Sequence, residues 1–217
     1  MTALRPLALV AVTALSCVAS IAHAGDPERG FRLGATGSFG FGGKVEVEVE
    51  NGGTFNGGTS KDDLEATVGF GLFGYVPVHR HFHVGLRTTF GWVTSEDVDT
   101  ANGDSTMVID ISPVLKARVP LMHDKAELYA ILPVGLTISI PPDNSSLVTL
   151  DTGIGWNVGL QFGASYLVTD AIGVLAEIGW QGRGATNGTA INGTSSGVDL
   201  TFTMHQFALN FGAYYVF

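Results

Sequence analysis

The sequence predicts an all-β protein: a single eight-stranded, antiparallel, up-and-down β-barrel that crosses a membrane. Three observations support this prediction. Apolar and polar residues alternate with a period of two in eight separate runs. The connections between the runs are short and long in turn, and aromatic residues gather at both ends of the apolar face. Each run reaches the roughly 9–11 residues that a tilted strand needs to cross a bilayer.

Residues 1–24 have the form of a secretory signal peptide. Arg5 supplies a positive charge, the stretch 7–18 is largely apolar, and Ala22-His23-Ala24 is a small-x-small cleavage pattern. We expect cleavage after Ala24, which leaves residues 25–217 as one barrel domain.

The only cysteine, Cys17, would leave with this signal peptide, so we expect no disulfide. Cleavage before Cys17, as in a lipoprotein, is the competing interpretation, but Leu15 stands one position out of the usual register. The whole chain has a net charge of −9, and loss of Arg5 makes it about −10. Such acidity argues against nucleic-acid binding, which depends on Lys and Arg.

Each of the first four runs places bulky apolar residues on one face and small or charged residues on the other, because a strand alternates its side chains across a sheet. With the leading residues of their apolar faces, these strands are 30–41 (Phe31, Leu33, Phe39, Phe41), 64–76 (Leu64, Val68, Phe70, Leu72), 82–92 (Phe82, Val84, Phe90, Trp92) and 106–119 (Met107, Ile109, Ile111, Leu115).

The last four runs repeat the pattern, and the final one ends the chain on Phe217. They are 126–138 (Leu128, Leu132, Val134, Leu136, Ile138), 154–166 (Trp156, Val158, Leu160, Phe162, Tyr166), 172–180 (Ile172, Val174, Ile178, Trp180) and 207–217 (Phe207, Leu209, Phe211, Tyr215, Phe217).

The connections sort strictly by length. Three of them, 77–81, 120–125 and 167–171, are short. The four that alternate with them are long, namely 42–63, 93–105, 139–153 and 181–197. Short turns at one end and long loops at the other are typical of bacterial barrels. Valine and glutamate alternate over residues 45–50, so the strands on either side of the first long loop are expected to extend beyond the membrane as a hairpin.

Aromatic residues on the apolar face form two predicted girdles. The girdle at the long-loop end comprises Phe39, Phe41, Trp92, Trp156 and Trp180, and the girdle at the short-turn end comprises Phe31, Phe82, Tyr166, Tyr215 and Phe217. Girdles of this kind mark the two membrane–water interfaces. In the alternative, a soluble eight-stranded barrel, aromatic residues would gather near the strand centres.

The opposite face carries ionisable residues among many glycines. These predicted lumen residues are Arg32, Glu65, Arg87, Asp110, Lys116, Arg118, Glu127 and Glu177. Eight strands enclose a space about wide enough for side chains to fill, and charges within it must be paired because isolated buried charges are costly. Inward aromatic residues such as Tyr75 and Tyr129 favour a plugged lumen over an open pore.

Together these features resemble the eight-stranded outer-membrane barrel superfamily, to which the transmembrane domain of outer membrane protein A belongs. The resemblance covers residues 25–217 and rests on the strand pattern, the sorted connections, the signal peptide and Phe217. It implies a place in the outer membrane of a Gram-negative bacterium, with loops outside and termini in the periplasm. It also implies that periplasmic chaperones deliver the chain and that the barrel-assembly machinery reads Phe217.

Metal and enzyme sites have little support in the sequence. Acidic residues in the second long loop, Asp97, Asp99 and Asp104, are weak candidates for a divalent cation, without EF-hand spacing. The histidines of 79–83 are typical of a wet, polar turn. Lipid A deacylases use a His-x-Ser pair, whereas His205 is followed by Gln206 and Phe207. We therefore expect no cofactor, no resident metal and no enzymatic activity.

The expected function is a structural or surface-interacting role. The protein would be a monomer that contacts outer-membrane lipid and lipopolysaccharide, supports membrane integrity and presents acidic loops outside the cell. The alternative is a narrow channel for ions or small solutes through the charged lumen.

Overall fold

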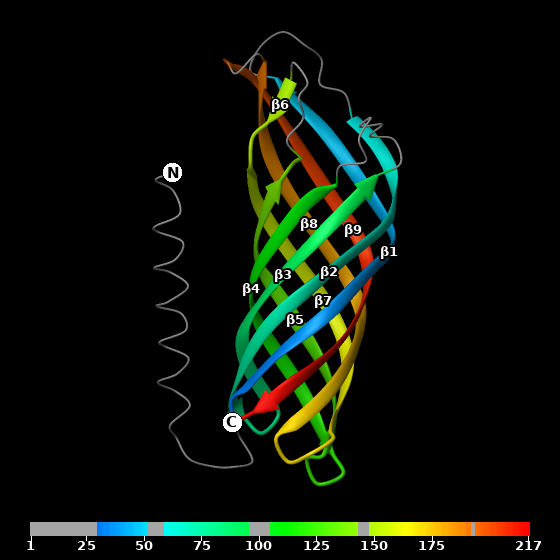
Figure 1. Ribbon diagram of the computed structural model, residues 1–217, viewed down its shortest axis with the longest axis vertical. Helices are drawn as coiled ribbons and strands as arrows, with labels where there is room; N and C mark the ends of the chain where they lie inside the picture. Colours follow the sequence, from blue (N-terminus) through cyan, green and yellow to red (C-terminus); the bar gives the residue numbers. More distant parts are fainter. Residues whose placement is uncertain (1–29, 52–58, 96–104, 143–147, 192–193) are drawn as a thin grey trace.

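Eight long strands form a closed ring in the computed structural model, which describes residues 30–51, 59–95, 105–142, 148–191 and 194–217 (Figure 1). The predicted signal peptide lies outside these residues. No helix in the described ranges has the length and apolar character needed to span a membrane.

Every ring strand pairs antiparallel with its neighbours, and β9 closes the ring by pairing with both β8 and β1. Closure removes the unpaired strand edges that lipid would leave without hydrogen-bond partners. A short ninth strand, β6 (Val148–Leu150), pairs with the far end of β8. The ring strands are β1 (Arg32–Asn51), β2 (Thr59–His79), β3 (Phe82–Ser95), β4 (Thr106–Leu121), β5 (Ala126–Ile140), β7 (Gly153–Leu167), β8 (Ile172–Ile191) and β9 (Thr194–Val216).

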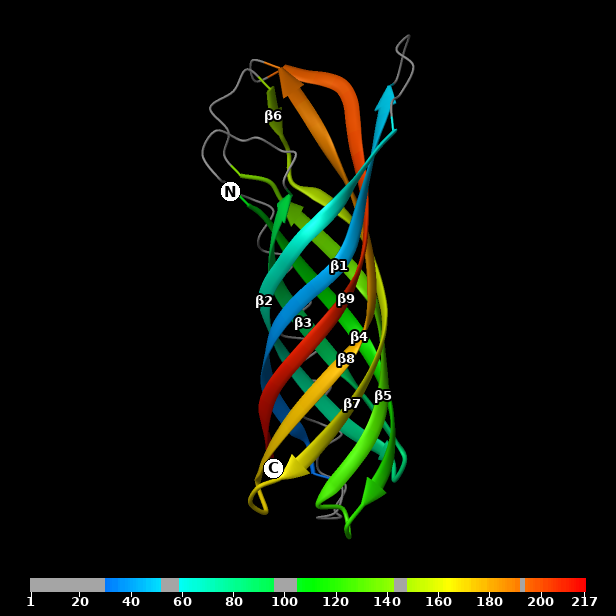
Figure 2. The same cartoon turned by 90° about the vertical axis from the view of Figure 1, so that its right-hand side faces the viewer.

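The three short turns and the C-terminus lie at one end of the barrel (Figures 1 and 2). The turns are residues 80–81, 122–125 and 168–171. At the same end the backbone nitrogen of Phe217 donates a hydrogen bond of 2.9 Å to the carbonyl oxygen of Phe31, which fastens the end of the chain to its first strand. The sorting of connections predicted from the sequence is therefore confirmed for the short turns.

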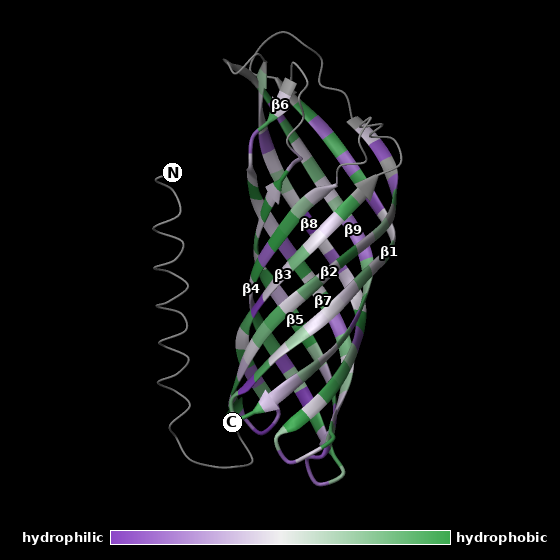
Figure 3. Ribbon diagram, in the orientation of Figure 1, coloured by the Kyte–Doolittle hydropathy of each residue, from purple (hydrophilic) through white to green (hydrophobic). Residues whose placement is uncertain are grey.

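The barrel is apolar outside, and its lumen holds buried charged and amide side chains beside a cluster of buried aromatic and aliphatic ones such as Phe73 and Ile131. Large apolar side chains are exposed along every ring strand, as with Val68, Leu136 and Phe211 at 55%, 60% and 58%. Charged and amide side chains are buried on the inner face, as with Arg87 at 3%. Figure 3 shows the resulting alternation of hydrophobic and hydrophilic residues along the strands. Such an outer surface is stable only against lipid.

Two bulges at the same height reverse the alternation in β1 and β2. Gly42 adopts a positive φ of 60°, and the register against β9 shifts between Phe41 and Lys44. The register of β2 against β3 shifts between Leu64 and Thr67. An extra residue exchanges the two faces of a strand beyond it. The prediction that Leu64 faces outward is therefore wrong: its side chain is 6% exposed and lies inside.

The strands at the long-connection end extend further than expected. Residues 181–197, predicted to be a loop, are mostly strand, because β8 continues to Ile191 and pairs with β9 as far as Ile191–Thr194. β1 likewise pairs with β2 out to Glu48 and Thr59, which confirms that the strands of the first hairpin extend beyond their predicted ends. Backbone pairing between β8 and β9 forms strands in this segment although its small, polar residues suggest a loop.

The predicted girdle residues lie on the outer face in two clusters. At the long-connection end Phe41 stacks on Phe207 with ring centroids 6.3 Å apart, and Trp156 is 45% exposed. At the short-turn end Phe217 contacts Phe31 and Tyr215 at 5.7 and 4.8 Å. Their position at the two lipid–water boundaries stays a prediction.

Replacing Phe162 with arginine tests the lipid-facing wall. Phe162 is 57% exposed on β7, midway between Trp156 and Tyr166. An arginine there should lower the free energy of unfolding in lipid vesicles by about 2–4 kcal/mol, the cost of arginine near the bilayer midplane. Val168→Arg is the matched control, because Val168 is similarly exposed, at 60%, but lies in a short turn. Equal effects of the two changes would contradict a membrane-spanning wall.

Candidate functional site

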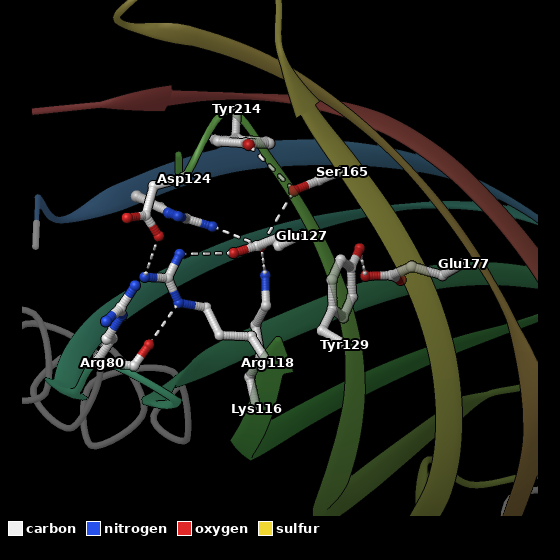
Figure 4. A network of polar contacts seen from close by, with 10 residues as sticks. Arg80, Lys116, Arg118, Asp124, Glu127, Tyr129, Ser165, Glu177 and Tyr214 are labelled. Carbon is white, nitrogen blue, oxygen red and sulfur yellow. Dashed lines mark hydrogen bonds and ion pairs between the residues drawn. The ribbon is translucent and has the colours of Figure 1, made fainter. Parts of the chain in front are cut away.

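Among the side chains that the structure describes, three buried lumen carboxylates each stand at the centre of a polar cluster. Nearest the short turns, Glu127 receives hydrogen bonds from Arg32 Nη1 at 2.6 Å, from Arg118 Nη1 at 2.9 Å and from Lys116 Nζ. Ser165 donates to the same carboxylate at 3.1 Å. Figure 4 shows these side chains converging on Glu127 from several strands. Three cations around one buried carboxylate form a charge-assisted cluster of the strong kind.

Tyrosine rings separate the Glu127 cluster from a second cluster, which lies further from the short turns. Lys116 Nζ lies 3.7 Å from the centre of the Tyr129 ring, a cation–π contact. A Cβ atom on Gly163 would lie 2.6 Å from Cζ of Tyr129, and one on Gly173 would lie 2.2 Å from Cζ of Tyr214. A side chain at either wall position would have to push the tyrosine ring aside, so glycine here leaves the room that the two rings occupy.

Glu177 is the centre of the second cluster, halfway along the barrel. Its Oε2 accepts a 2.8 Å hydrogen bond from Arg87 Nη2, and its Oε1 accepts one of 3.0 Å from Tyr129. Arg87 also donates to Gln161 at 2.9 Å and to Thr36 at 3.4 Å. Asn210 donates to Gln161 and Glu177 at 3.2 and 3.3 Å.

These six residues, which we call the central layer, come from six different ring strands. They are Thr36 of β1, Arg87 of β3, Tyr129 of β5, Gln161 of β7, Glu177 of β8 and Asn210 of β9. None is more than 5% exposed. The layer therefore spans the lumen from wall to wall with hydrogen-bonded side chains.

The third cluster lies toward the long-connection end, around Asp110. Arg183 Nη2 lies 3.0 Å from Asp110 Oδ2. Thr137 donates to the other carboxylate oxygen at 2.6 Å, and Thr89 donates at 3.1 Å. Arg183 was missed in the sequence because residues 181–197 were assigned to a loop. The inward positions 173, 175, 177 and 179 already pointed to it, since the same alternation leads to 181 and 183.

The structure brings seven of the eight predicted lumen residues into these clusters. The three clusters lie at three heights along the barrel and do not form one site. They are centred on Glu127 with its three cations, on Glu177 with Arg87, and on Asp110. Glu65 lies in β2, but its side chain is outside the described part of the structure. Gln161 and Asn210 were also missed as members, because neutral amides on an inner face carry no charge signal.

Only some of the weaker candidates lie in the part of the chain that the structure describes. Asp97, Asp99 and Asp104 lie outside the described residues. Within the described ranges, no three His, Cys, Asp or Glu side chains are grouped so as to hold a metal ion. His205 is exposed on the outer face and stacks on Trp180 at 5.6 Å, whereas Glu177 is buried in the lumen.

Comparisons with known proteins agree with this architecture. A family model described as the outer membrane protein beta-barrel domain matches residues 8–202. The crystal structure of OprG from Pseudomonas aeruginosa is 12% identical, with 87% of this chain and 96% of OprG aligned at a TM-score of 0.59. The AlkL structure, determined in lipid bilayers, is 16% identical, with 90% of this chain and 94% of AlkL aligned at a TM-score of 0.53.

A search of curated proteins finds no match. At such low identities the two solved structures support the fold alone. The family model spans most of the chain, and the closed ring of strands has the fold of these barrels. The chain therefore belongs to the outer membrane protein β-barrel domain family and is an outer-membrane protein.

Proposed function

We propose that this protein is a sealed outer-membrane barrel with a structural and surface-interacting role. Its lipid-facing wall supports the membrane and contacts lipid and lipopolysaccharide, while its extended strands present an acidic surface outside the cell. The observation that carries the proposal is the central layer, in which hydrogen-bonded side chains from six strands fill the lumen. The protein acts as a monomer, with its short turns and C-terminus in the periplasm.

The alternative, a narrow channel, requires a continuous wet path. A cavity of about 210 Å³ lies at the short-turn end, and a small one of about 20 Å³ adjoins Asp110 and Arg183. The central layer stands between the two cavities. Charged groups held this tightly would have to give up their partners before an ion passed, and that is costly in a low-dielectric interior. The geometry therefore favours a sealed barrel.

The surface role is supported by the strands beyond the bulges. The reversal at Gly42 turns the valines of β1 to the inner side, and Lys44 and Glu48 are exposed on the outer side. Glu46 lies there too and pairs with Lys61 of β2 at 3.0 Å. Asp199 of β9 is also exposed. The carboxylates named on this outer face outnumber its two lysines, which suits binding to a cationic partner or to bridging cations in the lipopolysaccharide layer.

Bulk ion flux tests the sealed barrel. Protein refolded into liposomes, with heat-modifiable gel mobility confirming the fold, should release trapped potassium no faster than protein-free liposomes. A Glu127→Gln variant that retains the central layer should be equally tight. Leakage that increases with the amount of folded wild-type protein would favour the channel.

Deleting Phe217 tests the assembly signal. Phe217 is 69% exposed, and its ring contacts Phe31 and Tyr215. Its deletion also removes one backbone hydrogen bond to Phe31 at the rim of the barrel, so refolding in detergent should change little. Insertion by purified barrel-assembly machinery should fall several-fold, because the terminal aromatic residue is what we expect the machinery to bind. Phe82→Ala is the control, since it removes another exposed aromatic residue of the same girdle. Equal insertion of wild-type and deleted chains would contradict this role.

A further inference from the structure

The cavity at the short-turn end, which we call the mouth pocket, has the size and lining of a binding site. Its volume of about 210 Å³ is room for several water molecules or one polyatomic anion. Arg32 and Arg118 line it from the lumen, and His83 lines it from β3. His123 and Lys125, both exposed in the turn between β4 and β5, complete its basic side.

Positive charge is in excess at the floor of the lumen. Arg32, Lys116 and Arg118 surround the Glu127 carboxylate, and Asp124 adds a second carboxylate 3.3 Å from Arg118. The cations of this cluster therefore exceed its anions by one. Beyond it, Lys125 and Asp170 on the pocket wall balance each other. A buried surplus charge is stabilised by a counter-charge, and the mouth pocket is the space in which an anion would reach it.

His83 supplies an independent sign of a missing partner. Its side chain is 2% exposed, and its Nδ1 is buried with no hydrogen-bond partner among the described residues. Buried polar atoms are almost always hydrogen-bonded, and an exception points to an unseen water or ligand. A neutral imidazole that carries its proton on Nδ1 is a donor. Nδ1 itself has almost no accessible surface, so an acceptor oxygen in the pocket would reach it after a rotation of the His83 ring, which lines the pocket.

The turn that walls the pocket is held in a strained conformation. Met122, His123 and Asp124 all have positive φ, at 51°, 55° and 65°. Three consecutive non-glycine residues in this region are unusual, and backbone strain of this kind clusters at ligand-binding sites. Arg118 holds the turn through Asp124, and the backbone nitrogen of Lys125 donates to the Met122 carbonyl at 3.3 Å. This turn conformation places His123 and Lys125 on the pocket wall.

We propose that the mouth pocket binds a small oxyanion, a phosphate or carboxylate group, with Arg32, Arg118 and Lys125 supplying charge and His83 Nδ1 donating a hydrogen bond. This inference is independent of the proposed function, because a sealed barrel and a channel would both retain the pocket. Arg118 already fixes its guanidinium on Glu127 and Asp124, so the anion meets a preorganised charge.

The test uses the full barrel in nanodiscs of zwitterionic lipid, titrated with inorganic phosphate against chloride at constant pH and ionic strength. The imidazole resonances of His83 and His123 should shift together and saturate, while those of His205 on the outer face stay still. Lys125→Gln should weaken phosphate binding about two- to fivefold, as expected for one partly exposed charge. His83→Phe should weaken it about tenfold or more, the usual loss for a hydrogen bond to a charged group.

Lys61→Gln is the matched control, since it removes one exposed lysine at the opposite end of the barrel. If His83→Phe does not fold, Lys125→Gln and His123→Asn decide the question, because both residues are exposed. A second arm replaces phosphate with an anionic phosphatidylglycerol bilayer. Saturable shifts with inorganic phosphate assign a soluble anion, and shifts with the anionic lipid alone assign a lipid headgroup. Linear shifts in both arms, or equal weakening by Lys61→Gln and Lys125→Gln, would overturn the proposal.

Discussion

Glu127→Gln is expected to lower the free energy of unfolding by about 3–5 kcal/mol, the range for breaking a buried ion pair by removal of one partner. The substitution leaves Arg32, Lys116 and Arg118 together in a space where their side chains are at most 9% exposed. Glutamine keeps the shape of the side chain and can still accept hydrogen bonds, so the loss reports the charge. This loss is measured by unfolding the protein with urea in detergent micelles and monitoring the transition by tryptophan fluorescence.

Glu48→Gln is the control for this change, because Glu48 carries the same charge on an exposed part of β1. Its effect should stay within about 0.5 kcal/mol, as for most surface substitutions. A Glu127→Gln effect as small as that of Glu48→Gln would mean that water reaches the cluster and screens its charges. The lumen floor would then be an aqueous vestibule instead of a packed core.

Arg87→Met is the second substitution with a large expected effect. The change leaves the Glu177 carboxylate, whose side chain is 2% exposed, without its charged partner. It also removes the hydrogen bonds that Arg87 donates to Gln161 and Thr36. We expect a loss of about 3–5 kcal/mol for the single change. The double variant Arg87→Met/Glu177→Met should lose less free energy of unfolding than the two single variants together, because neither unpaired charge remains in it. The coupling should be about 0.5–3 kcal/mol in favour of the native pair.

If the losses in the free energy of unfolding from Arg87→Met and Glu177→Met simply add in the double variant, a direct Arg87–Glu177 ion pair is contradicted. Asp110→Asn supplies a comparison within the same lumen, since Asp110 pairs with Arg183 in a different cluster. Combined with Arg87→Met, it should be close to additive, because the two clusters share no charged partner in the contacts described.

Alternation along the sequence predicts which way a lumen residue faces but not what it contacts. Arg87 and Glu177 were both expected inside, yet their pairing depends on the stagger of strands β3 and β8, which lie 90 residues apart in the chain. The hydrophobic period does not tell how far along the barrel axis each of these residues lies. The sequence could therefore predict a charged lumen, whereas its division into three clusters required the ring to be closed.

The two errors have local causes. Leu64 was placed outside because a period of two was carried through a bulge, and a single extra residue exchanges the two faces. Gly, Thr and Asn dominate the surroundings of Arg183 and predict a loop, although the inward series from Glu177 leads directly to it. Within the strands, glycine marks close approach of tyrosine rings to the wall, as at Gly163 and Gly173.

The fold and the proposed role rest on one physical arrangement. The apolar wall excludes water from outside, so the inner charges have to neutralise one another across the lumen. That requirement produces carboxylate-centred clusters, and the middle one reaches across six of the eight ring strands. Rigidity of the barrel then supports the strands that extend beyond it as a stable platform.

Single-channel recording of the refolded wild-type barrel in a planar bilayer tests the sealed lumen most directly. We expect a silent baseline for correctly folded protein at all applied voltages, with current steps only when Arg87 and Glu177 are both replaced by alanine. Stable current steps from the wild-type barrel, with an ion selectivity that changes on substitution of Arg87 or Glu177, would contradict it and make the central layer the filter of a channel.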